Sequence, residues 1–310
     1  MRFLVPPLAL FVLSLLIGPA GFGLPIPLIL WQLRLPRALL ALLVGGGLAA
    51  SGAALQGALR NPLADPGLLG LSGSAALGAV IAFYWGLARI FPPALPIAGM
   101  LGAGAGAAAL LGFAGRNPSG ASLILAGIGL SAATAATIAF ALALAPNAYA
   151  LAELTFWLLG SLADHTLLDC ALAAPPIVLG VLLLLRLGPG LDALALSEET
   201  SASLGFLPSR TFRQAALGTA LAAGAAAASA GGIGFVGLVV PNLLRPLLGE
   251  RPGALLFPAM CTGAALVLAA DILVRLAVMA LPLHAEPPIG VLTALLGAPF
   301  LVLIARRMVG

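Results

Sequence analysis

Long apolar runs, separated by proline, glycine and charged residues, follow one another along almost the whole chain. A helix needs about 20 residues to cross the hydrocarbon of a bilayer. The runs predict membrane-spanning helices near residues 3–18, 38–58, 67–88, 94–114, 120–144, 167–186, 210–230, 234–248, 254–280 and 289–305. Barrel strands would alternate polar and apolar residues, and runs such as Leu101–Leu111 do not. The pattern therefore predicts an all-α polytopic membrane protein, with about ten spans in one transmembrane domain over residues 1–310.

Composition supports a membrane protein and excludes several other classes. The chain is 62% hydrophobic and 8% charged, whereas a soluble domain carries about 25% charged residues. All 14 basic residues are arginines and form no basic tract, so nucleic-acid binding is not expected. Without lysine the chain cannot form a standard ATP-binding P-loop. Cys170 and Cys261 lie in separate apolar stretches and are interpreted as packing residues, and no metal-binding motif is present.

The distribution of arginines predicts the orientation of the ten spans. Ten arginines fall on the side of the termini, namely Arg2, Arg60, Arg116, Arg186, Arg210, Arg213, Arg245, Arg251, Arg306 and Arg307. Four fall on the other side, namely Arg34, Arg37, Arg89 and Arg275. Because cytoplasmic loops carry the excess of positive charge, both termini are expected to be cytoplasmic. The first apolar run, which follows Arg2, is interpreted as a retained helix rather than a signal peptide.

One interruption of the apolar pattern is the turn within Gln56–Gly67. The pairs Asn61–Pro62 and Asp65–Pro66 are typical of turns that interrupt a helix. An ordinary cytoplasmic loop is the alternative.

A second interruption, Gly231–Arg245, combines glycines that loosen a helix with Pro241, which removes a backbone hydrogen bond. Freed backbone groups are tolerated only against protein or a water-filled path; a kinked packing helix is the alternative.

A third interruption is the polar stretch Asp192–Arg213. Ser197 is placed to cap a short helix whose first turn carries Glu198 and Glu199, and Gly205 is placed to end it. The pattern predicts a short helix outside the membrane on the cytoplasmic side. It is either a solvated loop helix or a surface that a soluble partner binds.

The last unusual feature is a set of arginines on the side that the positive-inside rule disfavours. Arg34 and Arg37 flank a proline, and Arg275 lies four residues after Asp271 on one helix face. These arginines could reach lipid phosphates or pair with Asp271 and Glu286.

In this order, these segments resemble the FecCD-type permeases of ATP-binding-cassette (ABC) importers for cobalamin, iron-siderophores and haem. The resemblance covers the chain from about Arg34 to Arg306. It rests on Arg34-Leu-Pro-Arg37, Ser51-Gly52 with Gln56, Asn61-Pro-Leu-Ala-Asp-Pro-Gly67, Ala126-Gly127, Trp157-Leu-Leu-Gly-Ser161, Leu204-Gly205, Gly234-Phe-Val-Gly-Leu-Val-Val-Pro241, Ala270-Asp271 with Arg275, Glu286-Pro-Pro-Ile-Gly290, and Leu296-Gly-Ala-Pro-Phe300.

The resemblance implies a type II ABC importer permease in the bacterial inner membrane. Such a subunit forms a homodimer around a central pathway, with two ATP-binding subunits on the cytoplasmic side and one periplasmic substrate-binding protein. The partner ATPase binds ATP and magnesium, so the permease is not an enzyme and no covalently bound cofactor is expected. The cargo is expected to be a metal chelate. Overall likeness favours haem, with iron-siderophore or cobalamin as alternatives.

The resemblance also implies roles for particular residues. Arg34, Arg37 and Arg275 match arginines that receive two glutamates of the binding protein. The coupling helices, at about residues 192–208, match the element that contacts the ATPase; the residues assigned there are Ser197, Glu198, Glu199, Ala202, Leu204 and Gly205. The cytoplasmic gate matches Asn61, Leu63, Gly120 and Ala121, of which the last two are small where relatives can carry hydroxyls. Asn242 stands where the family usually has histidine after proline.

Two other function classes compete with this interpretation. Gly70–Gly73 has the look of a serine protease motif around Ser72, but His165 and His284 fall in predicted periplasmic loops. A small-residue packing motif is the simpler explanation.

An ion-coupled transporter would carry ionisable groups deep in the membrane. Here nearly all 24 charges lie at predicted helix ends, which favours an external energy source. Tyr84, Tyr149 and the two histidines are not at mid-membrane positions, so the pathway offers few ligands to haem iron.

Overall fold

The computed structural model describes residues 2–18, 21–23, 26–91, 93–145, 147–281 and 285–309, with the backbone alone at residues 88, 89 and 303–309. His284 and the side chains of Arg89, Arg306 and Arg307 therefore lie outside the described part. The α-helices are α1 (Val5–Leu16), α2 (Pro27–Ile29), α3 (Leu35–Leu59), α4 (Leu71–Tyr84), α5 (Leu87–Ile90), α6 (Ala94–Ala114), α7 (Gly120–Ala143), α8 (Ala148–Leu158), α9 (Leu167–Arg186), α10 (Gly188–Leu196), α11 (Glu198–Ser203), α12 (Pro208–Thr219), α13 (Ala225–Ala230), α14 (Val236–Leu248), α15 (Pro252–Ala280) and α16 (Ile289–Val309).

Short irregular elements join these helices. Two are 3₁₀ turns, η1 (Arg2–Leu4) and η3 (Pro66–Leu69), and two are π segments, η2 (Leu30–Arg34) and η4 (Ala220–Gly224). The π segments connect α2 to α3 and α12 to α13 without a break, so residues 27–59 and 208–230 each form one continuous rod. A two-residue antiparallel pair, β1 (Ile17–Gly18) with β2 (Gly21–Phe22), follows α1.

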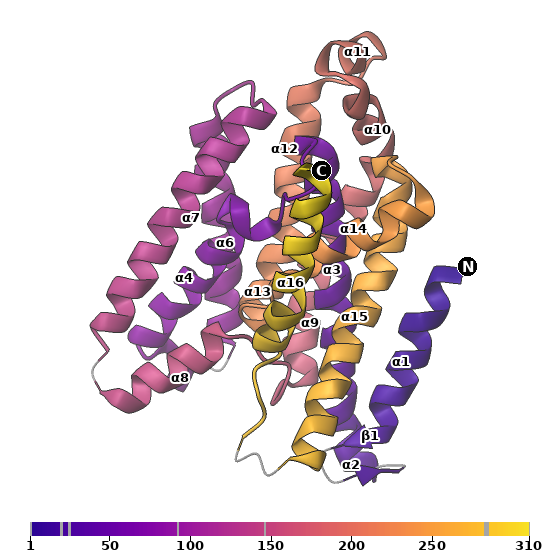
Figure 1. Ribbon diagram of the computed structural model, residues 1–310. Coiled ribbons are helices and arrows are strands. Elements are labelled where there is room, and N and C mark those ends of the chain that lie inside the picture. Colours follow the sequence, from indigo (N-terminus) through magenta and orange to yellow (C-terminus); the bar gives the residue numbers. More distant parts are fainter. Residues whose placement is uncertain are drawn as a thin grey trace.

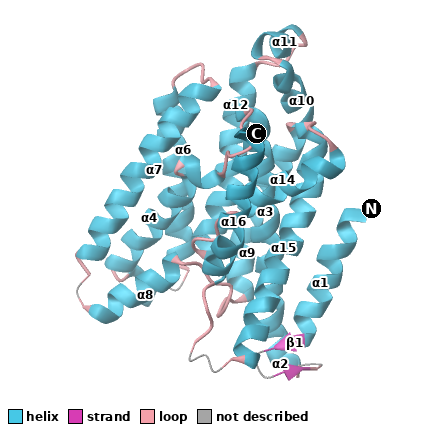
Figure 2. Cartoon of the chain, viewed as in Figure 1, coloured by secondary structure: helices cyan, strands magenta, loops and turns pink. Residues whose placement is uncertain are grey.

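The helices form a bundle in which most elements run along one common direction (Figure 1), and the all-helical class is evident in Figure 2. Among the described residues, five helices are long and apolar enough to cross a membrane: 27–59, 94–114, 120–143, 167–186 and 252–280. Shorter apolar helices coincide with four of the other predicted spans, at 2–16, 71–84, 236–248 and 289–302. The span predicted near 210–230 is the rod 208–230, which is not among these apolar helices. The structure therefore confirms an all-α protein with several membrane-capable helices.

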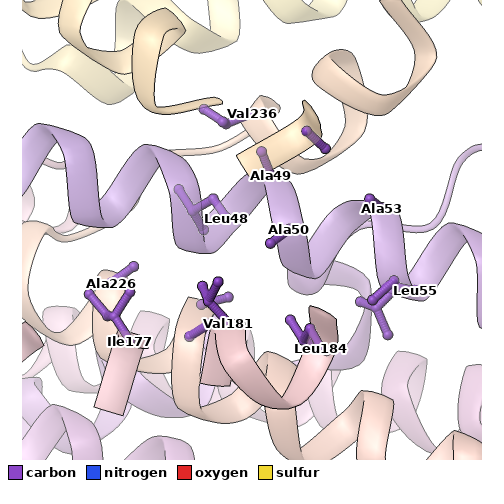
Figure 3. Close-up of a cluster of buried hydrophobic side chains, with 14 of the residues drawn as sticks. Leu48, Ala49, Ala50, Ala53, Leu55, Ile177, Val181, Leu184, Ala226 and Val236 are labelled. Carbon is purple, nitrogen blue, oxygen red and sulfur yellow. The ribbon is translucent and has the colours of Figure 1, made fainter. Parts of the chain in front are cut away.

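Helix α3 lies at the centre of the bundle and packs against α15, α9, α14 and α12. Its residues from Val44 to Ala58 are all buried and are mostly alanine, glycine and leucine. Figure 3 shows Leu48 and Ala50 of α3 on the side of Ile177 and Val181 of α9, and Ala49 on the opposite side, toward Val236 of α14. Inside a bilayer such helices gain little from the hydrophobic effect, so small residues stabilise them by letting backbones approach closely.

The structure adds elements that the apolar pattern did not predict. The pattern left residues 145–166 without a helix, but α8 forms there, capped by the Asn147 side chain, which accepts a hydrogen bond from the Ala150 N–H at 2.9 Å. Only Leu154 of this 11-residue helix is buried. Helix α10 and the α2–η2 extension were also missed. These pieces are too short to give a membrane-length apolar run, which explains the omission.

Candidate functional site

The unusual segments of the sequence gather at the two ends of the bundle. One end carries α10 and α11 and the other carries α2 and β1 (Figure 1); we call them the α11 end and the α2 end. Arg34, Arg37 and Arg275 lie at the α2 end. The turn after α3 and the stretch 192–208 lie toward the α11 end. The structure thus separates the residues assigned to docking from those assigned to coupling and gating.

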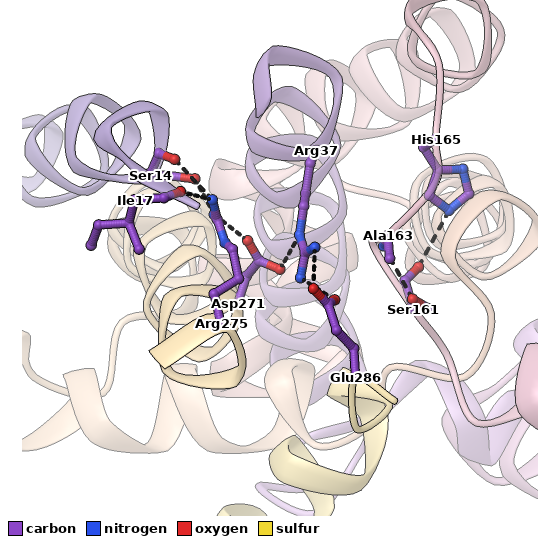
Figure 4. Close-up of polar contacts among 9 residues, drawn as sticks. All are labelled: Ser14, Ile17, Arg37, Ser161, Ala163, His165, Asp271, Arg275 and Glu286. Carbon is purple, nitrogen blue, oxygen red and sulfur yellow. Dashed lines mark hydrogen bonds and ion pairs between the residues drawn. The ribbon is translucent and has the colours of Figure 1, made fainter. Parts of the chain in front are cut away.

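At the α2 end, two arginines and two acids form a buried cluster (Figure 4). The Arg37 Nε lies 2.7 Å from Asp271 Oδ1, and its two Nη atoms reach the Glu286 carboxylate at 2.9 and 3.2 Å. Arg275 pairs with the other oxygen of Asp271. A forked guanidinium–carboxylate contact of this kind fixes geometry as well as charge. The cluster therefore holds α3, α15 and the segment before α16 together.

Arg275 also reaches the first helix. Its Nη1 donates to the carbonyl oxygens of Ser14 at 2.9 Å and Ile17 at 2.7 Å, and its Nη2 donates to the Ser14 hydroxyl. Its side chain is 1% exposed, against 12% for Arg37. The Arg275 side chain is thus almost fully enclosed by its own chain in this structure.

Arg34 is more accessible and is bound by backbone oxygens alone among the described residues. Its Nη1 donates to Leu15 O at 2.8 Å and Gly23 O at 3.1 Å. All three predicted docking arginines nevertheless border one cavity of about 470 Å³, together with Asp164 and Glu286. The structure brings the three arginines to one cavity, where Arg34 and Arg37 are partly exposed and Arg275 is buried.

Toward the α11 end, the turn after α3 is tied to α14 by a polar network. The Asn242 Nδ2 donates to Pro62 O at 2.9 Å and to Leu238 O at 2.7 Å. Arg245 donates to Asn242 Oδ1 and to Gln56 Oε1, both at 2.9 Å. The sequence marked Asn242 as a departure from the family pattern but did not predict this network, because its members lie up to 189 residues apart.

Gln56 compensates for a proline in α14. Pro241 has no N–H, so the carbonyl of Gly237, four residues earlier, loses its helical partner. The Gln56 Nε2, on α3, donates to that carbonyl oxygen at 3.1 Å. Gln56 is 2% exposed, and a buried amide without partners would be costly. The missing N–H of Pro241 therefore explains why a glutamine is buried at position 56. The Gln56 hydrogen bond in turn explains how α14 tolerates the proline.

The gate residues divide between two places. The Asn61 side chain accepts a hydrogen bond from the Leu63 N–H at 2.9 Å, which closes the turn. Both residues line an apolar cavity of about 620 Å³, which Ile124 and Ile128 of α7 also line. Gly120 and Ala121 form the first turn of α7, after a capping box made by Ser119 and Ser122. They are not among the residues that line this cavity, although a Cβ at Gly120 would lie 3.8 Å from Leu59, which does line it.

Asp65 lies beside the gate turn, between the 620 Å³ cavity and a smaller one of about 180 Å³. Its Oδ1 accepts a hydrogen bond from the Gly67 N–H at 2.9 Å, which caps the 3₁₀ turn η3. Burial raises the pKa of the Asp65 carboxyl above its ordinary value, and the Gly67 hydrogen bond lowers it by less. The folded protein thus disfavours the ionised form of Asp65.

This raised pKa predicts a dependence of stability on pH. As pH rises from the ordinary aspartate value of 3.8 through the raised pKa, the unfolded chain loses its proton first. The free energy of unfolding should therefore fall across that window and level off above it. Asp65→Asn keeps an oxygen for the Gly67 N–H and removes the titration, so its unfolding midpoint should fall less over the same window. Thermal unfolding in detergent across a pH series measures the midpoint of the wild-type protein and of Asp65→Asn. If the two midpoints fall equally with pH, Asp65 does not have the raised pKa.

The coupling segment forms two short helices that meet at Ser197. The Ser197 Oγ accepts a hydrogen bond from the Thr200 N–H at 2.9 Å, and Gly205 has a positive φ of 86° directly after α11. The predicted cap and stop of the short helix are confirmed. Glu198 and Glu199 lie in its first turn, as predicted.

This segment presents apolar side chains at its tip and is fixed at its base. Leu204 and Leu207 are 58% and 62% exposed, and Ala202 is exposed beside them. At the base, the Asp192 carboxylate accepts hydrogen bonds from Arg251 at 3.0 Å and from the Gly253 N–H at 2.8 Å, where α15 begins. The segment therefore combines a hydrogen-bonded base with an exposed apolar tip.

The residues of the rival hydrolase interpretation are not arranged for catalysis. Ser72 lines the small cavity beside Asp65. His165 lies at the α2 end, where its Nε2 is 3.3 Å from Ser161 O and its Nδ1 is 3.9 Å from Asp169. His165 is thus engaged elsewhere, and His284 lies outside the described residues.

Comparison with known proteins gives consistent results over nearly the whole chain. The model of the FecCD transport family matches residues 8–307. The vitamin B12 import system permease protein BtuC of Klebsiella pneumoniae is 39% identical over 287 residues, covering 91% of this chain and 84% of that protein. The cobalamin import system permease protein BtuC of Halobacterium salinarum is 34% identical over 299 residues, covering 93% and 77%.

A solved structure gives the same result in three dimensions. It is described as an inward-facing conformation of a metal-chelate type ABC transporter, and it is 31% identical with a TM-score of 0.84. The match covers 99% of this chain and 97% of that one. The order of motifs, the helical bundle and these similarities agree, and the chain belongs to the FecCD transport family.

Proposed function

We propose that this protein is the transmembrane permease of an ABC importer that moves cobalamin, or a closely related metal chelate, into the cytoplasm. The observation that carries the proposal is the match of about nine-tenths of the chain to permeases named for vitamin B12 and cobalamin import. The resemblance in sequence motifs favoured haem, with cobalamin as an alternative. The two BtuC permeases support the cobalamin alternative, and neither of them is named for haem.

The assembly proposed is a homodimer with ten membrane helices per subunit, two ATP-binding subunits and one periplasmic binding protein. The α11 end would be cytoplasmic and the α2 end periplasmic in the inner membrane, as the arginine distribution favours. The free ends of α1 and α16 both point toward the α11 end (Figure 1), in agreement with cytoplasmic termini. ATP and magnesium would bind to the partner subunits, and the permease would contribute no catalytic group.

The proposed mechanism passes a contact at the α11 end to the gate turn. The ATPase would bind the tip of α11, and the anchor of Asp192 on the start of α15 would make the segment move as one body. Helix α15 packs along α3, which ends at the gate turn. ATP-driven closure would then shift α3 and α14 relative to each other and open or close the cavity lined by Asn61 and Leu63, as a two-state switch.

Function is tested by reconstituting the complex, purified with its native ATPase, in proteoliposomes. ATP hydrolysis and uptake are measured with the binding protein loaded with cyanocobalamin, with haem or with nothing. Stimulation by the cyanocobalamin-loaded protein is expected. Stimulation by haem alone would reassign the cargo, and uptake that stops with an ionophore but not without ATP would favour an ion-coupled transporter instead.

Docking of the binding protein is predicted to depend on Arg34. Arg34→Glu places a carboxylate where an acidic partner would bind, and should weaken docking at least about tenfold, because a charge-assisted hydrogen bond contributes about 1.5–3 kcal/mol. Arg34 is preferred to Arg37 as a target because Arg37 is already paired inside the chain. Arg116→Glu, an exposed arginine at the opposite end, is the matched control. Surface plasmon resonance on nanodiscs measures docking, and an unchanged dissociation constant for Arg34→Glu would exclude this role.

Coupling is predicted to depend on Leu204. Leu204→Glu puts a charge at the exposed apolar tip and should weaken ATPase association at least about tenfold, or uncouple hydrolysis from uptake, since losing an apolar contact of this size costs about 1.4 kcal/mol or more. Leu204→Met keeps an apolar side chain and should behave as wild type. Co-purification of the ATPase and uptake per ATP hydrolysed measure the effect. Normal coupling in Leu204→Glu would show that the tip does not make the contact.

A further inference from the structure

A cavity of about 590 Å³ lies under the coupling segment, between the ends of α3, α10 and α14 and the start of α15. Its polar wall is formed by Gln56, Arg60, Asn61, Asn242, Arg245 and Glu250. It is separate from the apolar cavity beside the gate, although Asn61 borders both. We propose that this cavity binds a phosphate group, with Arg245 and Arg60 as its cationic contacts. The phosphate would belong either to the headgroup of a phospholipid with net negative charge or to free phosphate.

The first support is the way in which Arg245 is held. Two of its nitrogens donate to the side-chain oxygens of Asn242 and Gln56 at 2.9 Å. Both amides are fixed in turn by backbone carbonyl oxygens, those of Pro62 and Gly237. A guanidinium has five N–H donors, and Arg245, which uses two of them among the described residues, lines the cavity. A planar fork that is fixed before binding loses little entropy when it binds a phosphate.

The second support is that the Arg245 guanidinium has no close ion-pair partner among the described side chains. Arg245 is only partly exposed, yet no carboxylate oxygen among the described side chains lies within 4 Å of its guanidinium; the ion pairs of this region join Arg251 to Asp192 instead. Burying a charge is costly unless an opposite charge accompanies it. Glu250 borders the same cavity and acts on Arg245 through its charge, but it is exposed and makes no ion pair with Arg245. A bound anion would supply the close counter-charge that the described side chains do not.

Arg60 supplies a second positive charge at the rim. It is exposed, it follows the last residue of α3 with a positive φ of 48°, and it makes no ion pair within the described part of the chain. Both arginines lie at helix C-termini, where the helix dipole favours a cation by about 0.3–1 kcal/mol at exposed positions. The helix dipole explains why α3 and α14 each have an arginine at the C-terminal end. It does not explain why both arginines line the same cavity.

Phosphate fits this cavity better than a larger or apolar ligand. Guanidinium groups recognise phosphate through paired N–H donors, and the neutral amides that hold Arg245 leave its charge unneutralised. The cavity lies where α3 and α14 end and α15 begins, at the depth where lipid headgroups would be found if the α11 end faces the cytoplasm. A bound phosphate would also contact the network that holds Pro62, so occupancy should influence the gate turn.

The test uses the full-length protein in neutral detergent and needs neither cargo nor ATPase, so its outcome is independent of the proposed function. The unfolding midpoint is followed by tryptophan fluorescence while sodium phosphate replaces sodium chloride at constant ionic strength. In parallel, nanodiscs of phosphatidylcholine are compared with nanodiscs that contain equal parts of phosphatidylcholine and phosphatidylglycerol. Arg245→Gln and Arg60→Gln remove the two cationic contacts, and Arg116→Gln removes an exposed arginine away from the cavity as control.

A saturable rise of the midpoint with phosphate, lost or at least about tenfold weaker in Arg60→Gln and Arg245→Gln but kept in Arg116→Gln, would support a site for free phosphate. A rise with phosphatidylglycerol alone, with the same dependence on the variants, would support a headgroup site. No rise with either probe, or an equal rise in all variants, would overturn the proposal. If Arg245→Gln does not fold, Arg60→Gln, which lies outside the hydrogen-bonded network, decides the result.

Discussion

Gly52→Val is expected to prevent α3 and α14 from packing and to leave little folded protein in the membrane. A Cβ at residue 52 would overlap the backbone carbonyl of Gly237, and α3 cannot move away freely because its Gly45 meets Gly263 of α15 in the same manner. Overpacking a core costs about 1–3 kcal/mol when side chains can adjust. Here the added Cβ would meet backbone atoms, which cannot adjust as a side chain can. We therefore expect the free energy of unfolding to fall by more than about 3 kcal/mol.

The matched control is Gly104→Val in α6, where an added Cβ would meet nothing within 4 Å. Both variants add the same side chain to the interior of an apolar helix, and they differ in the space available. Unfolding in detergent mixtures and the yield of monodisperse protein measure the difference. Equal stability of the two variants would show that α3 and α14 do not approach as closely as described.

Local signals in the sequence predicted local structure well. Ser197 and Gly205 predicted the start and stop of α11, because a cap and a positive-φ glycine act within one or two turns. Apolar runs of membrane length predicted α6, α7, α9 and α15 to within a few residues. The same signal missed α8, since 11 residues with an Asn147 cap give no run long enough to register.

Long-range contacts could not be predicted from the residues alone. Arg245 meets Gln56 across 189 residues, and Arg275 meets Ser14 across 261. The sequence raised the pairing of the arginines with Asp271 and Glu286 as one alternative, and the structure confirms it for Arg37 and for Arg275. The burial of Arg275 was not foreseen, because it depends on carbonyl oxygens at the end of α1.

The sequence predicted the identity of the cargo less well than the fold, and the reason is physical. A pathway that releases its substrate carries few specific ligands, so its residues say little about what passes. Under the proposed function, the apolar cavity beside Asn61 and Leu63 would form part of that pathway. Its lining of mostly leucine, isoleucine and glycine would not distinguish haem, siderophore and cobalamin. Recognition is expected to lie mainly in the binding protein.

Asp271→Ala is expected to be the most destabilising change at the α2 end. Asp271 is 1% exposed and bridges two guanidiniums, Arg37 and Arg275. Its removal leaves Arg275 buried with neutral oxygens alone, and breaking a buried ion pair in this way costs about 3–5 kcal/mol. Arg37 keeps its contact with Glu286, so the loss should fall mainly on the packing of α1 against α15. The free energy of unfolding in detergent and the protease accessibility of α1 measure it.

A double-mutant cycle separates the charge from the packing. Arg275→Met with Asp271→Leu replaces the buried pair by apolar side chains, which is often far less costly than removing one partner. The carbonyl oxygens of Ser14 and Ile17 lose their donor, so some destabilisation should remain. The double variant should nevertheless lose at least about 1 kcal/mol less than the sum of the two single changes. Additive losses would mean that Asp271 and Arg275 are not energetically coupled, and that α1 is held by packing rather than by this ion pair.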